Sequence, residues 1–182
     1  MYLDTIFAIL NEFYPNEINS LKTSQDFCKI DWNSLIKKTK CQNSYDKGKA
    51  LENLAYYFFN CINDIKITGK NIRCFTEEID LCFCTHSNDS LFWKLGPVVL
   101  VECKNQVEKI SAKIIRNLSS IMEIKGITGA ILFTTSALTK PALEEIQKSK
   151  NLNKKIIVLY LNDIINNTNK SPYDILKKKL LN

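Results

Sequence analysis

Two opposite charges follow an apolar run in the segment "GPVVLVECKNQ", residues 96–106. The continuous apolar, largely β-branched run is typical of a strand that is buried on both faces, so this strand is expected to be central in its sheet. Side chains alternate along a strand, so Glu102 and Lys104 share one face while Cys103 points to the other. On their own, these two charges could form an ordinary ion pair at the end of a strand.

An acidic pair with the same spacing, Glu78 and Asp80, precedes this strand. If the two strands pair, Asp80 and Glu102 approach each other. Two carboxylates about 4 Å apart repel by about 4 kcal/mol at an effective dielectric constant of about 20. Lys104 could neutralise one charge, whereas a divalent cation neutralises both, and Mg²⁺ prefers hard oxygen ligands. With a lysine nearby to orient the attacking water or stabilise developing charge, such a cation suits phosphodiester hydrolysis.

The elements that must position these residues follow from the periodicity of the apolar side chains. A helical spacing is present in "KGKALENLAYYFFNCI", residues 47–62, which predicts an amphipathic helix there. Consecutive strands of an antiparallel meander are expected next, separated by the turn signals "TGKN" and "TEE", at residues 64–68, 71–75 and 78–84.

From Val98 onward, strand and helix signals alternate. After the strand at 97–104, we expect a long helix over 107–126, a strand over 128–136, a helix over 138–150 with Pro141 in its first turn, and a strand over 155–161. This β-α-β-α-β order predicts right-handed crossovers and parallel pairing. A short basic helix is expected at 171–182. The predicted fold class is α/β, with a central mixed β-sheet flanked by helices.

The composition is that of one soluble domain. The chain has 182 residues, 45% of them hydrophobic, and its 25 Lys and Arg against 19 Asp and Glu give a net charge of +6. This mild excess suits a polyanionic partner without requiring one. Seven cysteines, an odd number, and the absence of a signal-peptide pattern predict a reduced, cytoplasmic protein. No apolar run approaches the roughly 20 residues of a membrane span, so no membrane partner is expected.

An acidic residue on one strand followed by Glu-x-Lys on the next resembles the signature of the PD-(D/E)xK restriction-endonuclease-like superfamily. The chain is similar to its Mrr-like branch, in which a helix carrying Gly and Glu precedes the strands, as Gly48 and Glu52 do here. The segment "TGAILFTTSALTKPALEEI", residues 128–146, and the closing strand "KIIVLYLNDI", residues 155–164, also resemble that branch. The resemblance covers roughly residues 47–163 and rests on the order and spacing of the motifs.

We expect a restriction-endonuclease-like nuclease domain over residues 45–182, preceded by an N-terminal helical segment over residues 1–44, in a single compact domain overall. The resemblance implies a metal-dependent endodeoxyribonuclease of the Mrr-like restriction or defence type, with Mg²⁺, or alternatively Mn²⁺, as cofactor and DNA as partner. It also favours a homodimer, for which the apolar N-terminal helix is a candidate interface.

The same resemblance implies roles for individual residues. Asp80, Glu102 and the carbonyl of Cys103 would bind the metal, and Lys104 would act on the water. Glu52 would lie at the edge of the catalytic site and reach a second metal through water.

Other residues are candidates for contacts with the DNA backbone. Lys109, Lys113 and Arg116 recur on one side of the long helix that follows the site, where they would track phosphates. Ser136 or Thr135, which follow a strand, would contact a phosphate by the resemblance, although hydroxyls in such places most often cap a helix.

Departures from the family pattern leave alternatives open. The residues before Asp80 are "FTEEI" rather than a Pro- or Gly-rich approach, so Glu78 could take its role. His86 is a further candidate for touching substrate, whereas Cys82 and Cys84 lack the spacing of a structural zinc site. The runner-up functions are a structure-selective nuclease, such as a Holliday-junction resolvase, and a non-cleaving DNA-binding or assembly module of the same fold.

Overall fold

The computed structural model describes residues 30–74 and 77–181 of the chain. Contacts between residues separate a unit that ends at Ile30 from one that starts at Asp31. Helix α3, Trp32–Lys38, belongs to the second unit, and its Ile36 is part of that unit's core. The helix expected near the N-terminus, and the dimer interface expected on it, lie outside the described residues.

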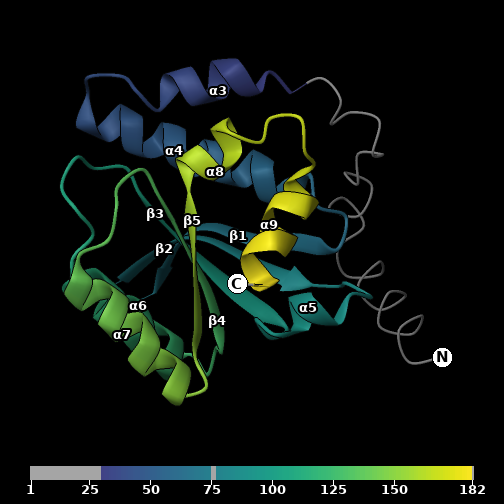
Figure 1. Cartoon of the computed structure of the whole chain (residues 1–182), viewed down its shortest axis with the longest axis vertical. Helices are drawn as coiled ribbons and strands as arrows, with labels where there is room; N and C mark the ends of the chain where they lie inside the picture. The colour runs from purple at the N-terminus through teal and green to yellow at the C-terminus, as the bar shows by residue number, and fades with distance from the viewer. Residues whose placement is uncertain (1–29, 75–76, 182) are drawn as a thin grey trace. The chain divides into compact units, whose positions relative to one another are not determined.

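In the described part of the chain, five strands form one mixed sheet in the order β1-β2-β3-β4-β5 (Figure 1). Strands β1, β2 and β3 pair antiparallel, and β3, β4 and β5 pair parallel. The apolar strand β3 is central, as its sequence predicted, and the mixed α/β architecture is confirmed. The strands are β1 Ile65–Cys74, β2 Glu77–Thr85, β3 Val98–Lys104, β4 Gly129–Thr134 and β5 Lys155–Tyr160.

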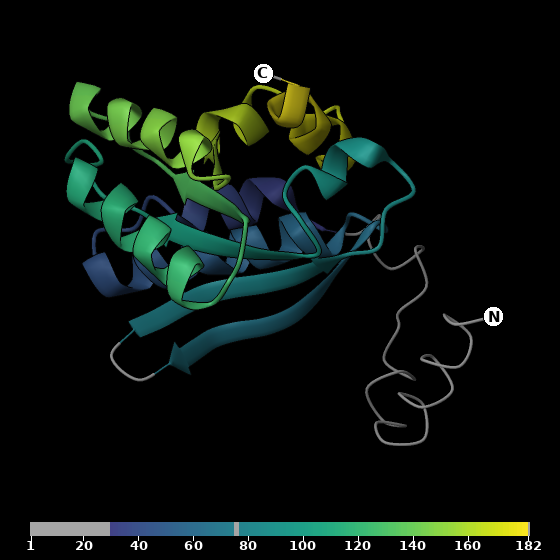
Figure 2. The same ribbon diagram turned by 90° about the horizontal axis from the view of Figure 1, so that it is seen from below.

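Helices cover both faces of this sheet (Figure 2). One face packs against α4, α8 and α9, and the other packs against α6 and α7. The helices described within residues 30–74 and 77–181 include none that could span a membrane. The helices are α4 Ser44–Asn60, α5 Ser90–Trp93, α6 Ala112–Ile124, α7 Lys140–Asn151, α8 Leu161–Ile165 and α9 Pro172–Leu181.

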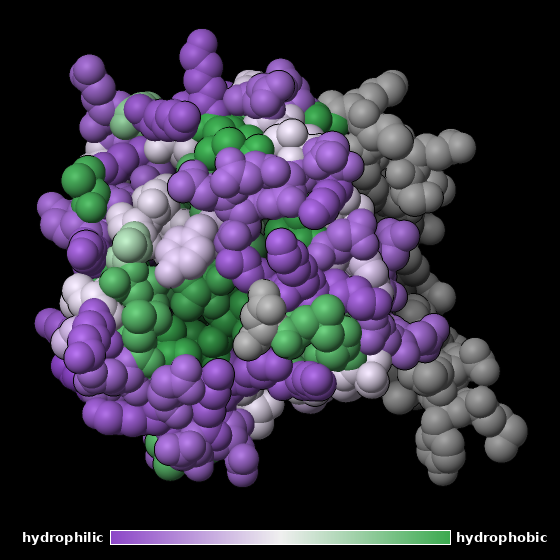
Figure 3. Space-filling model, in the orientation of Figure 1, coloured by the Kyte–Doolittle hydropathy of each residue, from purple (hydrophilic) through white to green (hydrophobic). Residues whose placement is uncertain are grey.

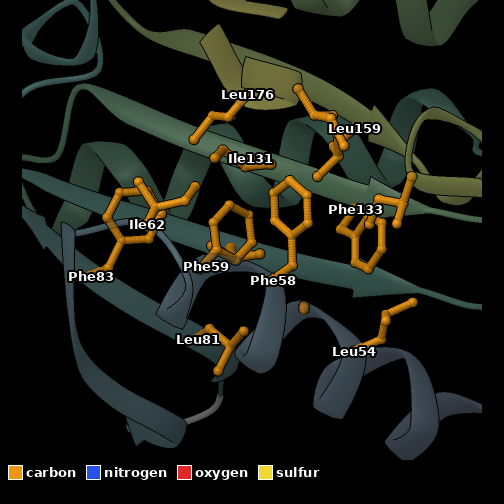
Figure 4. Packing of buried hydrophobic residues seen from close by; sticks show 14 of the residues in the cluster. Leu54, Phe58, Phe59, Ile62, Leu81, Phe83, Ile131, Phe133, Leu159 and Leu176 are labelled. Atoms are coloured by element: carbon orange, nitrogen blue, oxygen red, sulfur yellow. The ribbon is translucent and has the colours of Figure 1, made fainter. Parts of the chain in front are cut away.

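Aromatic side chains fill the core between α4 and the sheet (Figure 4). Phe58 and Phe59 of α4 are buried, and the ring of Phe59 lies 5.3 Å from that of Phe83 on β2. Phe133 of β4 is also fully buried in this cluster. Burying an aromatic side chain of this kind contributes on the order of 2–3 kcal/mol. This packing therefore fixes the position of α4 against the central strands of the sheet.

The meander prediction was wrong in one respect. Strand β1 runs without interruption from Ile65 to Cys74, where two short strands and a turn at "TGKN" were expected. The pairing register with β2 shifts between Ile67 and Gly69, and Asn71 has a positive φ of 51°. The Gly and Asn signals thus mark a bulge and a local distortion inside one strand, because both residue types tolerate such backbone angles.

The long helix after β3 is also shorter than expected. The helix begins at Ala112 instead of Val107. The chain before it is extended, because Ile110 pairs with Leu138, a residue between β4 and α7, in an isolated β-bridge. Its end agrees with the prediction, since Gly126 has a positive φ of 63° just beyond it. The order β4-α7-β5 and the C-terminal helix α9 are confirmed.

Candidate active site

The carboxylate of Asp80 lies at the point where the pairing of β2 and β3 ends. The antiparallel register runs from Cys84 opposite Val98 to Leu81 opposite Val101. One step further along β2, Oδ2 of Asp80 accepts a 2.7 Å hydrogen bond from the backbone N–H of Cys103. A side chain thereby takes the place of the next backbone acceptor in the ladder. The bond fastens Asp80 beside the end of β3.

Glu102 and Lys104 meet on the same strand. Nζ of Lys104 lies 2.5 Å from Oε1 of Glu102, and the Glu102 side chain is only 17% exposed. Cys103 between them is buried in the core that α4 covers. The alternation expected from the sequence therefore holds, and it directs both charges away from the thiol.

Burial and neighbouring charges shift the pKa values of Asp80 and Lys104 at this site. Burial, and after it the neighbouring charge of Glu102, raise the pKa of Asp80 to about 7, although the hydrogen bond from Cys103 acts in the opposite direction. Burial alone would lower the pKa of Lys104, but the charge and hydrogen bond of Glu102 outweigh it, so the pKa of Lys104 is raised. The lysine is therefore a persistent cation, whereas Asp80 titrates near neutrality.

Glu52 approaches the site from α4. Its side chain is buried, and Oε2 accepts a 2.7 Å hydrogen bond from Lys49 one turn earlier on the helix. Lys49 also donates to Asn71 of β1 at 3.2 Å, which ties the helix to the sheet. The charge of Glu52 contributes to the raised pKa of Asp80, so the two carboxylates lie near one another. Glu52 is thus placed at the edge of the Asp80 site.

The donor atoms suit a hard cation. Asp80 and Glu102 offer carboxylate oxygens, and the charge of Glu102 raises the pKa of Asp80 more than the charge of Lys104 lowers it. No group of three or more His, Cys, Asp or Glu side chains clusters as a metal site within residues 30–74 and 77–181. The carbonyl of Cys103, which the sequence also suggested, is the candidate for a third protein-derived ligand. Oxygen donors of this kind fit Mg²⁺, which keeps several water ligands.

Asn105 is a positioning residue that the sequence did not reveal. Its side-chain amide donates to the carbonyl of Thr39 at 2.9 Å and to that of Lys47 at 2.7 Å. Its Oδ1 accepts a 3.2 Å hydrogen bond from the hydroxyl of Thr135, beyond β4. One side chain thus joins the end of β3 to the C-terminal end of α3, to the first turn of α4 and to the loop after β4. An amide directly after Glu-x-Lys is the only local signal for this role.

The four residues predicted to contact the DNA backbone differ in their exposure and in the elements that carry them. Lys113 and Arg116 are exposed on α6, and Arg116 approaches Glu145 of α7 at 3.4 Å. Lys109 is exposed but precedes the helix, so its expected place on α6 was wrong. Ser136 is buried, and its hydroxyl donates to the carbonyl of Gln106. The roles of these four residues in DNA binding stay predictions.

The other acidic and imidazole candidates lie apart from this arrangement. Glu78 is exposed and stands opposite Arg73 in the ladder with β1, whereas Asp80 makes the bond to Cys103. His86 is exposed beyond the end of β2 at Thr85, at the opposite end of the strand from Asp80. Six residues of extended chain separate His86 from Asp80, about 20 Å.

The family model of Mrr_cat, described as a restriction endonuclease, matches residues 76–166, half of the chain. The matched region runs from β2 to α8 and contains Asp80, Glu102 and Lys104. The chain therefore belongs to this restriction endonuclease family. It is a restriction-endonuclease-like nuclease, and its mixed sheet with flanking helices is consistent with the core of that fold.

Comparison with solved structures finds similarity to the structure of Pyrococcus furiosus SfsA in complex with Ca²⁺, with a TM-score of 0.36 and 15% sequence identity. The alignment covers 62% of this chain and 55% of that one, so this chain spans just over half of its length. No curated protein matches the chain.

Proposed function

We propose that the protein is a Mg²⁺-dependent endodeoxyribonuclease that hydrolyses phosphodiester bonds in DNA, of the Mrr-like restriction or defence type. The observation that carries this proposal is the meeting of Asp80, Glu102 and Lys104 at the end of the central strand, through the 2.7 Å bond to Cys103 and the 2.5 Å ion pair. Two carboxylates that can hold a divalent cation, with a lysine beside them, suit metal-assisted phosphodiester hydrolysis.

Asp80 and Glu102, with the carbonyl of Cys103, would hold the cation. When bound, Mg²⁺ would polarise the phosphate and lower the pKa of a water ligand. The raised pKa of Asp80 supports this assignment, because a buried carboxylate beside a second one gains most from a neighbouring cation. Mn²⁺ prefers similar ligands and is expected to substitute.

Lys104 has a different role. Because its pKa is raised, its ammonium group stays protonated at neutral pH and acts as a hydrogen-bond donor rather than as a general base. It would orient the attacking water or stabilise negative charge that develops on the phosphate. A preorganised donor of this kind contributes most where water is excluded, and Lys104 is only 35% exposed.

The remaining parts of the proposal concern the partner and the setting. Lys109, Lys113 and Arg116 would contact the DNA backbone, since all three are exposed near the chain that leaves β3. Cleavage of both strands would need a homodimer or repeated cleavage events, because one site cuts one strand. The free thiols of Cys41, Cys61, Cys82, Cys84 and Cys103 support a reducing compartment such as the cytoplasm.

The experiment that tests this function is a cleavage assay with supercoiled plasmid, modified and unmodified, in Mg²⁺ or Mn²⁺, beside the Lys104→Ala variant. Branched DNA and RNA serve as further substrates. Nicking of plasmid by the wild type and its loss in the variant are the expected result. Equal nicking by both proteins would show that the site is wrongly assigned, and cleavage of branched DNA alone would favour a structure-selective nuclease. Binding without any cleavage would indicate a non-cleaving module.

A further inference from the structure

Strand β5 forms an open edge of the sheet. It is last in the strand order and pairs only with β4 among the described residues. Consecutive residues from Asn153 to Val158 line a groove of about 710 Å³. Because neighbouring side chains of a strand point to opposite faces, a groove lined by consecutive residues follows the edge of the strand itself.

The backbone of β5 offers hydrogen bonds along this edge. The N–H of Lys155 donates to the carbonyl of Thr128 at 2.7 Å, on the side of β4. Backbone groups alternate in direction along a strand, so Ile156 and Val158 direct their N–H and C=O groups outward. The outward N–H of Tyr160 is taken by the Asp163 carboxylate at 2.7 Å. The outward groups of Ile156 and Val158 have no backbone partner among the described residues, but Ile156 is only 3% exposed. A strand that pairs with Ile156 must therefore displace the side chains that cover it, and the far end of the edge is closed.

Two helices form the walls of the groove. Ile146 and Lys150 of α7 line one side, and Lys179, Leu180 and Leu181 at the end of α9 line the other. Figure 3 shows an apolar patch with a hydrophilic border over β5 between these helices. An edge strand flanked by apolar side chains in this way is the arrangement to which an extended peptide adds as a further strand.

The charge of the groove is positive. Lys94, Lys150 and Lys155 line it, and none of them forms an ion pair with a described residue. Burial, and after it the charges of Lys94 and Lys150, lower the pKa of Lys155, so the ammonium group of Lys155 is repelled by both neighbours. Carboxylates are absent from the lining residues. An acidic ligand would relieve this repulsion.

We propose that the groove along β5 binds an extended peptide of a partner protein in which acidic and apolar residues alternate. The peptide would pair with the outward backbone groups of Ile156 and Val158, insert apolar side chains between α7 and α9, and place carboxylates near Lys94, Lys150 and Lys155. The site lies at the amino ends of the parallel strands, whereas Glu102 and Lys104 lie at the carboxyl end of β3. It is separate from the nuclease site and does not depend on the proposed function.

Other occupants fit the groove less well. A second copy that paired its β5 antiparallel to this one would bring its Tyr160 end to the lysines. The carboxylate there, Asp163, is already bound by Lys179 at 2.7 Å and by the N–H of Tyr160. A nucleic-acid backbone would satisfy the lysines but would leave the apolar walls and the strand edge unused.

The test is a fluorescence-anisotropy titration of the full chain with a labelled peptide of alternating glutamate and valine. Matched peptides carry lysine in place of glutamate, or N-methylated valines that cannot donate to the strand. We expect binding of the first peptide, with affinity lower by about tenfold or more for the other two. Hydrogen exchange should show new protection at Ile156 and Val158.

Protein variants assign the binding to the groove. Lys150→Glu and Lys155→Glu are expected to weaken peptide binding about tenfold or more. Lys140 is exposed and lies on the same helix as Lys150 but outside the groove, so Lys140→Glu should leave peptide binding unchanged. Plasmid nicking and circular dichroism melting should be unaffected by all three changes, which separates a binding defect from a failure to fold.

Several results would overturn the proposal. No binding of the acidic peptide, undiminished binding by Lys155→Glu, or equal binding of the N-methylated peptide would each exclude strand addition at this edge. Dimer formation that the Lys150→Glu change abolishes would assign the groove to a second copy instead. Displacement of the peptide by a short DNA duplex at equal concentration would assign it to nucleic acid.

Discussion

The backbone N–H of Cys103 donates a 2.7 Å hydrogen bond to the carboxylate of Asp80. This bond joins β2 to β3 at the point where their ladder ends, and it brings a carboxylate from one strand to the Glu-x-Lys segment of the other. The bond stabilises the ionised form of Asp80, while burial and Glu102 destabilise it more strongly.

Replacing Asp80 by asparagine should stabilise the metal-free protein and abolish cleavage. Asparagine keeps the acceptor for Cys103 and removes the charge that burial and Glu102 oppose. We expect the free energy of unfolding at pH 8 in EDTA to rise on the order of 1–2 kcal/mol, allowing for partial exposure of the side chain. Urea denaturation measures this change. A loss of stability in Asp80→Asn would show that the ionised carboxylate of Asp80 does not destabilise the folded protein.

Asp80 should also make stability depend on pH. Its pKa is about 7 in the folded protein against an ordinary value of 3.8, so between these limits the folded state holds a proton that the unfolded state has lost. The stabilisation is therefore fully present below about pH 4, is lost as the pH rises to about 7, and changes by at most about 1.4 kcal/mol per pH unit. The difference between wild type and Asp80→Asn, measured by denaturation in EDTA, isolates this effect. A constant difference from pH 4 to 8 would contradict it.

Removal of the Lys104 ammonium should slow plasmid nicking by about 10²–10³-fold without unfolding the protein. The lysine is a permanent cation held against Glu102 at 2.5 Å, so Lys104→Ala removes a positioned donor. Initial nicking rates at saturating DNA measure the effect, and circular dichroism reports on the fold. Lys104→Arg, which keeps the charge, serves as the matched control and should retain more activity. Full activity in Lys104→Ala would remove this residue from the mechanism.

Divalent cations should raise the melting temperature through Asp80 and Glu102. A ligand at one hundred times its dissociation constant stabilises by about 2.7 kcal/mol, or about 5–11 °C for a chain of this size. Differential scanning calorimetry with increasing Mg²⁺ or Mn²⁺ tests this, with no DNA present. Asp80→Asn and Glu102→Gln should each reduce the shift, whereas Glu108→Gln, at an exposed residue outside the site, should not. The same shift in all variants would place the cation elsewhere.

Substitution of Asn105 should affect both stability and catalysis. Its amide donates to the carbonyls of Thr39 and Lys47, and Asn105→Asp keeps the shape of the side chain but cannot donate to either. Loss of these two bonds should cost about 1–3 kcal/mol of unfolding free energy. Asn105 would act by positioning Lys104, so kcat should fall more than KM rises in nicking assays, and Asn105→Gln should restore part of the activity. Unchanged kcat in a folded Asn105→Asp protein would limit the residue to a structural role.

Much of the fold could be predicted because its signals are local. The β-branched run of "PVVLV" predicted the central strand, and the alternation of strands and helices after it predicted the parallel half of the sheet. The local rules failed where a residue type serves two structures. Gly69 and Asn71 favour turns and also bulges, and only pairing with β2 along the whole of β1 determined which one formed.

The sequence by itself determined the chemistry of the site: which carboxylates and which lysine are available, and that Glu102 and Lys104 share a face, since the period of a strand is a local property. The tertiary structure decided which of Glu78 and Asp80 meets β3, because that depends on the pairing register between two strands separated by a loop. It also decided the hydrogen bonds of the Asn105 side chain and the groove along β5, since both are built from segments far apart in the chain. Such contacts arise only when the packing of the core brings those segments together.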